Sequence, residues 1–477
     1  MAVLSRRGLS ELMPIFLLVI VLLSGAVRSE EDGTQKPISI TSENARRYPD
    51  LPVLGYVTPW HSRGKQLVED NRQKFDIVSP VWYTVHAKGD GYEVQGGPPS
   101  EEDDEWYKRL QQATTSANGI ELKPLQVVPR FMLDGWNEDD YRQFIFNSTR
   151  WQSLSDVVME VVKEKHFDGV VFEAGATHLL SQSLVRLSEA LHSDDKLLVV
   201  VMQPIRPLGS DFDALAGNQA AMIEATNNLI LRALPQLSLV ADYFSIMTYD
   251  MSGPGGRAVS QKDIQNDKMS EAAATHDIRE PGPNTNAAWV RENLITFIEA
   301  TDPATANQLQ FQASLEALQA SRKFLMGIPL YGYKYPVVFA DKVTGKFIKP
   351  TPTIKPHEHA MMTGAAALKS RPKIPENAKP IMRDAGEPMT ATQIADVLKE
   401  HQPEIFKLEP EGEYYFDYQP DKNDIWTRVF LPTVEGITHV MNTIKDVVDD
   451  DLAYNFGGAG VALWEVGQST EELLASL

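Results

Sequence analysis

The most constraining stretch of this sequence is residues 167–175, Phe-Asp-Gly-Val-Val-Phe-Glu-Ala-Gly. It is an apolar run of β-branched and aromatic residues that contains one carboxylate, Glu173. A carboxylate inside such a run is costly to bury unless it has partners or a task. Helical periodicity at residues 153–165 and 180–192 predicts helix, buried strand and helix, which is typical of a parallel α/β sheet. In such sheets ligands bind at the carboxyl ends of the strands.

The same pattern repeats along the chain. Eight apolar runs predict strands, which we number one to eight: residues 53–57, 77–85, 125–131, 169–173, 197–202, 243–249, 324–330 and 460–466. Helical periodicity lies between several of them, at residues 180–192, 220–234, 287–300 and 434–448. This alternation predicts an α/β fold, the (β/α)8 TIM barrel.

The chain exceeds the roughly 250 residues of a minimal barrel, so we expect insertions. Residues 253–286 are rich in Gly, Pro and Asn and predict a long loop after strand six. Residues 340–387 contain many Pro, Lys and His and predict another loop after strand seven. Residues 413–418 and 427–433 then predict a hairpin.

Composition limits the functional classes. The 477 residues carry a formal net charge of −20, which argues against nucleic acid as a partner. The chain has no cysteine, so a large hydrophobic core must replace disulfides. No cluster of His, Cys and carboxylates has metal-ligand spacing, and no Gly-rich phosphate loop follows a strand, so we expect neither a metal nor a cofactor.

The N-terminal residues predict entry into the secretory pathway. Two arginines precede an apolar run at residues 13–23 and then small residues, the layout of a signal peptide, assigned to residues 1–29. An uncleaved anchor is the alternative; after cleavage we expect no stable membrane insertion. Residues 30–50 predict a linker before a barrel at 51–477, and Asn147 begins a glycosylation sequon. The expected destination is secretion or the lysosome.

Aromatic and polar residues gather at the carboxyl ends of the predicted strands. Aromatic faces beside carboxylates suit carbohydrate, because sugar C–H faces stack on rings and hydroxyls bond to polar groups. The alternative is that the rings cap the barrel core and the carboxylates face water. The candidate carbohydrate-binding residues are Trp60, Trp82, Glu173, Tyr249, Asp250, Tyr331 and Trp464.

Short motifs in the same order resemble the chitinase family of glycoside hydrolases, family eighteen. They are residues 167–169 (Phe-Asp-Gly), 247–250 (Met-Thr-Tyr-Asp), 327–332 (Gly-Ile-Pro-Leu-Tyr-Gly) and the strand with Trp464. Residues 55–60, 79–82, 166–169, 281–284 and 464–468 are most similar to the chitinase-domain-containing branch, also called stabilin-interacting chitinase-like proteins. The resemblance runs from about residue 51 onward and implies a barrel that binds N-acetylated glycans.

The resemblance also implies what this chain lacks. In active members strand four reads Asp-Gly-x-Asp-x-Asp-x-Glu, and the final Glu protonates the glycosidic oxygen while the substrate's acetamide attacks. Here Val171 and Glu173 occupy the second and third Asp positions, and Gly175 occupies the acid position. Strand alternation would place all three on one face. Because glycine cannot donate a proton, we expect no catalytic residue and a lectin-type protein.

Other readings of these residues stay open. An active glycosidase would use Glu173 with Asp250, if the substrate sat deeper. A purely structural Glu173 would be satisfied by Tyr249 or a backbone donor. A third class is a scaffold with a vestigial sugar site whose outer surface binds a protein receptor. At the rim, Arg130 and Asp134 predict an ion pair, and His61 and His86 are expected to be surface histidines.

Overall fold

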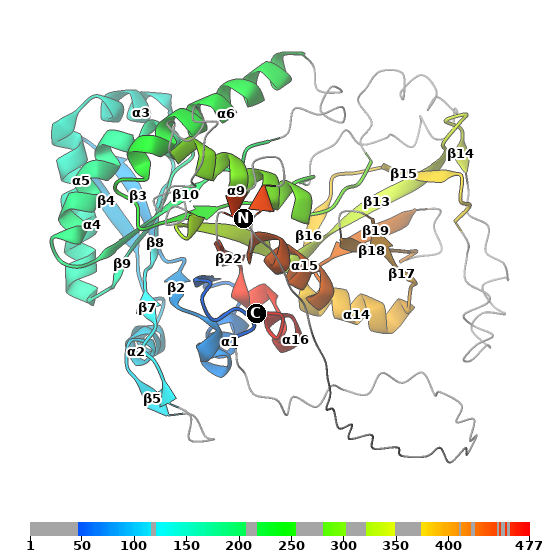
Figure 1. Cartoon of the computed structure of the whole chain (residues 1–477), viewed down its shortest axis with the longest axis horizontal. Helices are drawn as coiled ribbons and strands as arrows, with labels where there is room; N and C mark the ends of the chain where they lie inside the picture. The colour runs from blue at the N-terminus through cyan, green and yellow to red at the C-terminus, as the bar shows by residue number, and fades with distance from the viewer. Residues whose placement is uncertain are drawn as a thin grey trace, which may run out of the picture. The chain divides into compact units, whose positions relative to one another are not determined.

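The computed structural model describes residues 46–115, 121–206, 217–253, 280–301, 321–348, 374–409, 412–420, 425–445, 448–449, 454–455 and 458–477. Residues Asn44–Leu477 form one compact unit (Figure 1). The predicted signal peptide, most of the predicted linker, much of the two predicted loops and the predicted turn at 421–424 lie outside the described residues.

The larger of two main sheets is built from parallel strands and one antiparallel addition, β4. Its hydrogen-bonded order is β4-β3-β8-β9-β10-β11-β12-β22-β1-β2-β7. We call it the first sheet. Its strands are β1 (Val53–Val57), β2 (Ile77–Pro80), β3 (Tyr83–Lys88), β4 (Gly91–Gly96), β7 (Gln126–Val127), β8 (Arg130–Leu133), β9 (Gly169–Glu173), β10 (Leu197–Met202), β11 (Tyr243–Ile246), β12 (Phe324–Pro329) and β22 (Gly460–Trp464).

Three predicted strands coincide with β1, β9 and β10, and the predicted sixth, seventh and eighth strands end one to three residues too late. The predicted strand at 77–85 is divided into β2 and β3, and the one at 125–131 into β7 and β8. A proline lies at or beside each interruption, Pro80 and Pro129. Because proline has no N–H for the ladder, strands commonly end or bulge beside it.

Helices follow most of these strands, and in Figure 1 α4 and α5 run beside each other next to the first sheet. The predicted helices occur as α4, α5, α6, α9 and α15; α4, α6 and α9 are longer than predicted, whereas α5 begins one residue later and α15 ends at Lys445, with residues 448–449 in β20. The helices are α1 (Arg63–Asp70), α2 (Glu101–Leu110), α3 (Glu138–Ile145), α4 (Ser148–Lys165), α5 (Ser181–His192), α6 (Gly217–Leu237), α9 (Ala287–Thr301), α14 (Ala391–His401), α15 (Val434–Lys445) and α16 (Glu471–Leu474).

A second, antiparallel sheet follows β12. Its order is β14-β13-β19-β18-β17, with β15 and β16 also paired to β13. Its strands are β13 (Tyr331–Asp341), β14 (Phe347–Ile348), β15 (Ala378–Met382), β16 (Glu387–Thr390), β17 (Ile405–Leu408), β18 (Glu413–Tyr418) and β19 (Trp426–Leu431). The predicted hairpin is confirmed as β18 and β19. A loop over the whole of 340–387 is wrong, because β14 and β15 pair with β13 there.

Small elements complete the described fold. The remaining strands are β5 (Thr114–Thr115) with β6 (Glu121–Leu122) and β20 (Val448–Asp449) with β21 (Tyr454–Asn455). Short 3-10 turns are η1 (Arg72–Lys74), η2 (Thr177–Leu179) and η3 (Val466–Gln468). Among the described residues, no helix combines the length and apolar character needed to cross a membrane.

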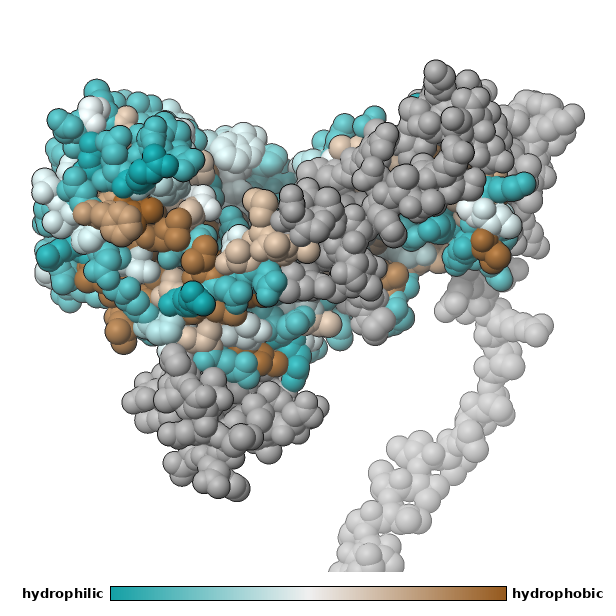
Figure 2. Space-filling view, turned by 90° about the horizontal axis from the view of Figure 1, so that it is seen from above, coloured by the Kyte–Doolittle hydropathy of each residue, from teal (hydrophilic) through white to brown (hydrophobic). Residues whose placement is uncertain are grey.

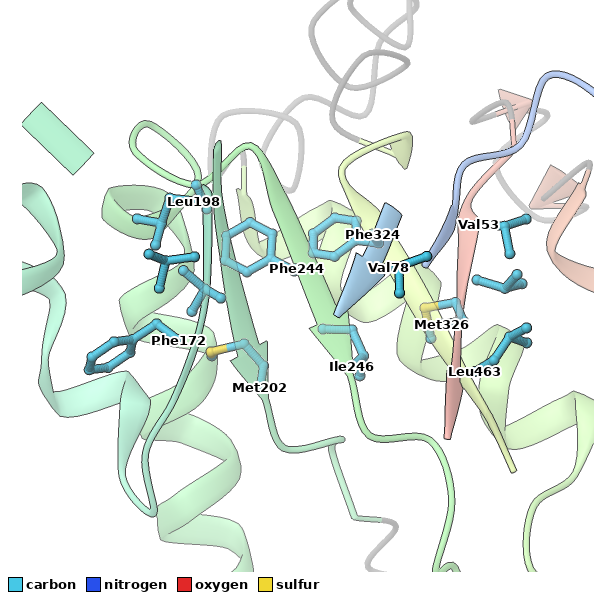
Figure 3. Packing of buried hydrophobic residues seen from close by; sticks show 14 of the residues in the cluster. Val53, Val78, Phe172, Leu198, Met202, Phe244, Ile246, Phe324, Met326 and Leu463 are labelled. Carbon is cyan, nitrogen blue, oxygen red and sulfur yellow. The ribbon is translucent and has the colours of Figure 1, made fainter. Parts of the chain in front are cut away.

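The first sheet has a hydrophobic core on each face. Side chains toward the helices form the outer core, which includes Phe172, Leu198 and Phe244 (Figure 3). Their neighbours on the same strands form the inner core, which includes Val171, Val199 and Trp464. Since successive strand residues point to opposite faces, a strand that is buried on both sides has a continuous apolar sequence. This explains the apolar runs from which the strands were predicted. Figure 2 shows one face of the molecule, where hydrophilic residues surround smaller hydrophobic areas.

Candidate functional site

Glu173 is the last residue of β9, and its side chain lies on the inner side of the first sheet. Val171 belongs to the inner core and Phe172 to the outer core, and residues two apart on a strand share a face. In the register of β8 against β9, Arg130 lies beside Val171, so Glu173 is its diagonal neighbour. Arg130 Nη1 lies 3.0 Å from Glu173 Oε2, with 12% and 22% of the two side chains exposed.

This ion pair offsets the free-energy cost of burying a carboxylate in an apolar strand. A charge taken partly out of water is tolerated when an opposite charge and a hydrogen bond accompany it. The sequence analysis offered Tyr249 or a backbone donor as a partner for Glu173. The observed partner is Arg130. The expected pair of Arg130 with Asp134 is wrong, since Asp134 Oδ2 lies 3.9 Å from His86 Nε2 instead.

Gly175 lies outside the strand. β9 ends at Glu173, and residues 175–176 form a turn that leads into η2. The expectation that alternation would place Gly175 on the inner face is therefore wrong, because the strand stops two residues earlier. A Cβ atom added at Gly175 would lie 3.6 Å from the Tyr141 hydroxyl oxygen, at ordinary contact distance.

Three aromatic rings lie together near Glu173. The Trp464 ring meets the edge of Tyr56 at 5.1 Å between centroids, and it lies nearly parallel to Tyr249 at 6.2 Å. The Tyr56 hydroxyl donates to Ser245 Oγ at 2.9 Å. Burial raises the pKa of both tyrosines above the usual value, and the charge of Glu173 adds to the rise. Both phenols therefore stay protonated, and the Tyr56 hydroxyl acts as a hydrogen-bond donor.

Asp250 lies just after β11 and is held by several groups. Its backbone has a φ of 54°, a conformation that Asp tolerates better than most residues. Its Oδ1 accepts from the hydroxyls of Tyr331 and Tyr333, the latter at 2.9 Å. Its backbone N–H donates to Asn284 Oδ1 at 2.8 Å, and its carbonyl accepts from Arg206 Nη1 at 3.0 Å.

The environment of Asp250 also keeps its two tyrosine partners protonated. Burial raises the pKa of Tyr331 and Tyr333, and the negative charge of Asp250 raises both further. Phenols that resist deprotonation are reliable donors to a carboxylate. The charges of Glu173 and Asp250 both add to the rise in the pKa of Tyr249, whose ring lies 6.2 Å from that of Trp464.

The structure brings five predicted residues together and leaves two apart. The Tyr249 ring stacks on Trp464, the charge of Glu173 acts on Tyr249, and Asp250 accepts a hydrogen bond from Tyr331. Trp60 follows β1 and is 62% exposed. Trp82 is 8% exposed and packs on Trp106 and Tyr107 in the outer core. The Trp82 ring therefore has little surface to offer a ligand.

Four residues of the site escaped the sequence analysis: Tyr56, Arg130 as the partner of Glu173, Asn284 and Tyr333. A signal existed for Arg130, because a basic residue in one apolar strand and an acidic residue in the next are candidates for a charge pair. Tyr56 and Tyr333 sit in apolar, aromatic strands and could have been noted by alternation. Asn284 belongs to the motif at residues 281–284, but its role was not predicted, since it joins Asp250 to the Tyr331 carbonyl across more than thirty residues.

A second carboxylate beside Trp464 is paired with a histidine. Glu465 is 1% exposed, and its carboxylate lies 2.5 Å from His61 Nδ1 and accepts from the Gly467 N–H at 2.9 Å. Burial raises the pKa of Glu465, while the Gly467 amide and His61 oppose the rise. His61 is thus oriented by a buried acid, although the sequence predicted a plain surface histidine. The peptide bond between Trp464 and Glu465 is cis.

A small pocket with about 20 Å³ of room for water lies beside Asn284 and Tyr331, two partners of Asp250. Asn284, Tyr331 and Glu413 line it together with residues of β19 and α15. No salt bridge to Glu413 occurs among the described residues, and burial alone raises the pKa of Glu413 to about 8. A carboxyl group in this setting is neutral over most of the physiological range. Among the described residues, no group of three His, Cys, Asp or Glu side chains could hold a metal ion.

Comparison with known proteins places this fold among chitinases. No family model matches the sequence. The structure resembles a chitinase from Chromobacterium violaceum, with a TM-score of 0.55 and 15% identity over 89% of this chain and 97% of that one. It also resembles the C-terminal domain of a putative chitinase from Desulfitobacterium hafniense (TM-score 0.54, 16% identity, 89% and 97% covered). YKL-39, solved in the presence of chitooligosaccharides, is also similar, with a TM-score of 0.52 and 13% identity over 89% of this chain and 98% of that one.

These likenesses show the fold. The chain has a mixed α/β architecture with curled sheets that chitinases and chitinase-like proteins share, at low sequence identity. They do not test the similarity of the motifs to the chitinase-domain-containing branch, so membership of that branch remains a prediction.

Proposed function

We propose that the first sheet is a closed (β/α)8 barrel of the chitinase type. β2 and β3 then form one interrupted strand, as do β7 and β8. Because β2 pairs with β7 and β3 pairs with β8, the two ends of the sheet path meet at these halves. In the resulting ring of eight strands, the spatial order follows the chain order and neighbours are parallel, as in a TIM barrel. The second sheet is then an insertion after strand seven.

In this barrel the protein binds N-acetylated glycans such as chitin oligosaccharides and leaves them intact. The observation that carries this proposal is the pairing of Glu173 with Arg130, next to a glycine at 175. Glu173 Oε2 accepts a hydrogen bond from Arg130 Nη1 at 3.0 Å, whereas a general acid must present a proton to the glycosidic oxygen. Glu173 is thus suited to accept hydrogen bonds from a sugar.

The parts of the site divide into contact and support. Trp464, Glu173 and Asp250 keep partial exposure and would meet the sugar ring and its hydroxyls. Tyr56, Tyr249 and Tyr331 are buried, so they would hold these three in place. The chitooligosaccharides present with YKL-39 indicate a ligand class that this fold accommodates. The more exposed Trp60 would lie at the edge of the site.

Calorimetric titration with chitotetraose tests the proposal. The wild-type protein should give binding heat, and Trp464→Ala should bind at least about tenfold more weakly, since truncating a central aromatic anchor commonly costs 2 kcal/mol or more. Trp60→Ala is the matched control, because Trp60 is an exposed tryptophan without a ring contact to the site among the described residues, and a smaller loss is expected. An unchanged affinity in Trp464→Ala would contradict the site.

The two rival functions predict different results when the protein is mixed with the same oligosaccharides. Reducing ends released from chitotetraose, and abolished by Glu173→Gln, would establish the alternative glycosidase that uses Glu173 with Asp250. No heat from the wild-type protein with any chitin oligosaccharide would favour a receptor-binding scaffold with a vestigial sugar site. Both outcomes would end the proposal of a non-hydrolytic lectin.

We also propose that the chain enters the secretory pathway, is secreted or delivered to lysosomes, and carries a glycan on Asn147. Asn147 is exposed and caps α4, with its Oδ1 accepting from Thr149 N and Arg150 N at 3.1 and 3.3 Å. The Nδ2 atom, to which a glycan attaches, is not used in the cap. Thr149→Ala removes the sequon and keeps the cap, so it should abolish a deglycosylation mass shift and change stability little.

A further inference from the structure

The turn after Glu173 meets a rigidly held tyrosine. Tyr141 lies on α3, and its hydroxyl oxygen is 3.6 Å from the position where a Cβ at Gly175 would stand. The backbone amides of Gly175 and Ala176 face the same hydroxyl and oppose the rise that burial causes in the pKa of Tyr141. The Tyr141 hydroxyl thus lies directly beside the turn, and its O–H bond remains available as a donor.

Packing fixes the direction of that hydroxyl. The Tyr141 ring contacts Trp136 at 5.5 Å between centroids. Trp136 is itself held by its Nε1–H bond to the Val85 carbonyl, at 2.9 Å, and by edge contact with Phe144. A ring clamped in this way loses little further entropy on binding a ligand. The hydroxyl is therefore preorganised.

A third polar group completes the cluster. Gln203, just past the end of β10, is exposed and donates from Nε2 to the Gly175 carbonyl at 3.4 Å. No described residue accepts a hydrogen bond from the Tyr141 hydroxyl, and the Tyr141 side chain is partly exposed. The cluster carries no charge, in contrast to the Arg130–Glu173 pair beside it. Hydroxyl and amide groups of this kind recognise the hydroxyls and ether oxygens of a neutral sugar.

The sheet order separates this cluster from Trp464. In the ring proposed above, two strands (β1 and the interrupted strand of β2 and β3) lie on one side between β22, which ends in Trp464, and β8, which precedes Tyr141, and four strands (β9 to β12) lie between them on the other side. Adjacent strands are about 4.8 Å apart, so the two groups lie at well-separated points of the ring. One sugar ring stacked on Trp464 would not reach Tyr141, whereas a chain of two or more rings would.

We propose that Tyr141, supported by the Gly175–Ala176 turn and Gln203, is a hydrogen-bonding contact for the second sugar of a bound neutral oligosaccharide. This inference rests on the proposed glycan-binding function and assigns a residue and a minimum ligand length to it. Tyr141 occupies the space beside a position that has no side chain of its own. The protein thereby binds a glycan with an uncharged donor at that point.

Removal of the hydroxyl tests the contact. Tyr141→Phe keeps the packing on Trp136, so the melting temperature should stay close to wild type. Its affinity for chitotetraose in calorimetric titration should fall about three- to tenfold, the usual loss for one hydrogen bond. Binding of the monosaccharide N-acetylglucosamine, followed by ligand-observed NMR, should not change. Tyr83→Phe is the matched control, because the Tyr83 hydroxyl is buried without a hydrogen-bond partner in the described part of the chain.

A second variant covers the case in which Tyr141→Phe misfolds. Gly175→Leu keeps the hydroxyl and fills the space in front of it; a Cβ fits there, and oligosaccharide affinity should again fall while monosaccharide binding persists. Equal affinity of wild type and Tyr141→Phe for chitotetraose would overturn the inference and leave the proposed function intact, as would an equal loss for both ligands. Failure of the wild-type protein to bind either ligand would instead overturn the proposed function.

Discussion

Two glutamates of this chain, Glu173 and Glu413, end up in opposite environments although both lie at an end of an apolar strand. Glu173 keeps partial exposure and a guanidinium 3.0 Å away. Glu413 is 8% exposed, lines a small pocket and has no salt bridge among the described residues. Burial raises the pKa of Glu413 to about 8. The comparison teaches that the surroundings, and not the residue type, decide how a glutamate in an apolar strand is accommodated: by an ion pair at Glu173, and by a raised pKa at Glu413.

The largest expected effect breaks the charged half of this comparison. Arg130→Met leaves Glu173 without its cation and should lower the free energy of unfolding by about 2 to 3 kcal/mol, less than for a fully buried pair because both side chains are partly exposed. Denaturant unfolding at pH 7 measures it. Glu173→Leu in the same background should restore much of the loss.

A surface pair supplies the control for that prediction. Arg142 and Glu138 are 65% and 87% exposed, so Arg142→Met should change stability by less than about 0.5 kcal/mol. A loss in Arg130→Met no larger than this would show that the Arg130–Glu173 pair contributes no more than an exposed one.

The next expected effect concerns Glu413, the glutamate without a charged partner. The folded-state pKa of Glu413, about 8, lies above its ordinary value of 4.5. Between these values the folded protein holds a proton that the unfolded chain has released, so this group makes stability fall as pH rises from about 4.5 to 8. Glu413→Gln should remove that slope, so the free energy of unfolding of the variant minus that of the wild type should rise by on the order of 2 kcal/mol between pH 5 and pH 7.

Unfolding measured at several pH values between 4 and 9 tests this expectation. Glu409→Gln is the matched control, because Glu409 is exposed and paired with Lys407, and it should keep the wild-type slope. If Glu413→Gln and wild type show parallel pH profiles, Glu413 is ionised in the folded protein and the contrast with Glu173 disappears.

The smallest effect sharpens the comparison with a third carboxylate, Asp250, which is satisfied by phenols. Tyr333→Phe removes one of its two tyrosine donors and should cost about 1 kcal/mol of stability. Binding of chitotetraose should weaken only slightly, because Tyr331 still donates. Tyr335→Phe, whose hydroxyl donates at 3.0 Å to the Gly253 carbonyl, is the control that should leave sugar binding unchanged. An equal change in sugar binding for both variants would exclude a special role for Tyr333.

The two sheets differ in how far the sequence predicted them. In the first sheet, β9 and β10 match the expected bounds because each is a continuous apolar run that ends at polar or turn residues. In the second sheet, β13 continues to Asp341 through residues expected to form a loop. Its partners β19 and β15 come from later in the chain, and such long-range pairing leaves no local pattern in β13 itself.

The sequence by itself determined the strand that carries Glu173, the face on which this side chain lies, and the absence of a side chain at Gly175. Periodicity and residue type are local properties, and burial on both faces of a parallel strand writes them directly into the chain. The tertiary structure decided that Arg130 is the partner, that Trp82 is packed away and that Tyr141 stands beside the turn. Strand register and side-chain packing set these contacts, and both depend on residues that are distant in sequence.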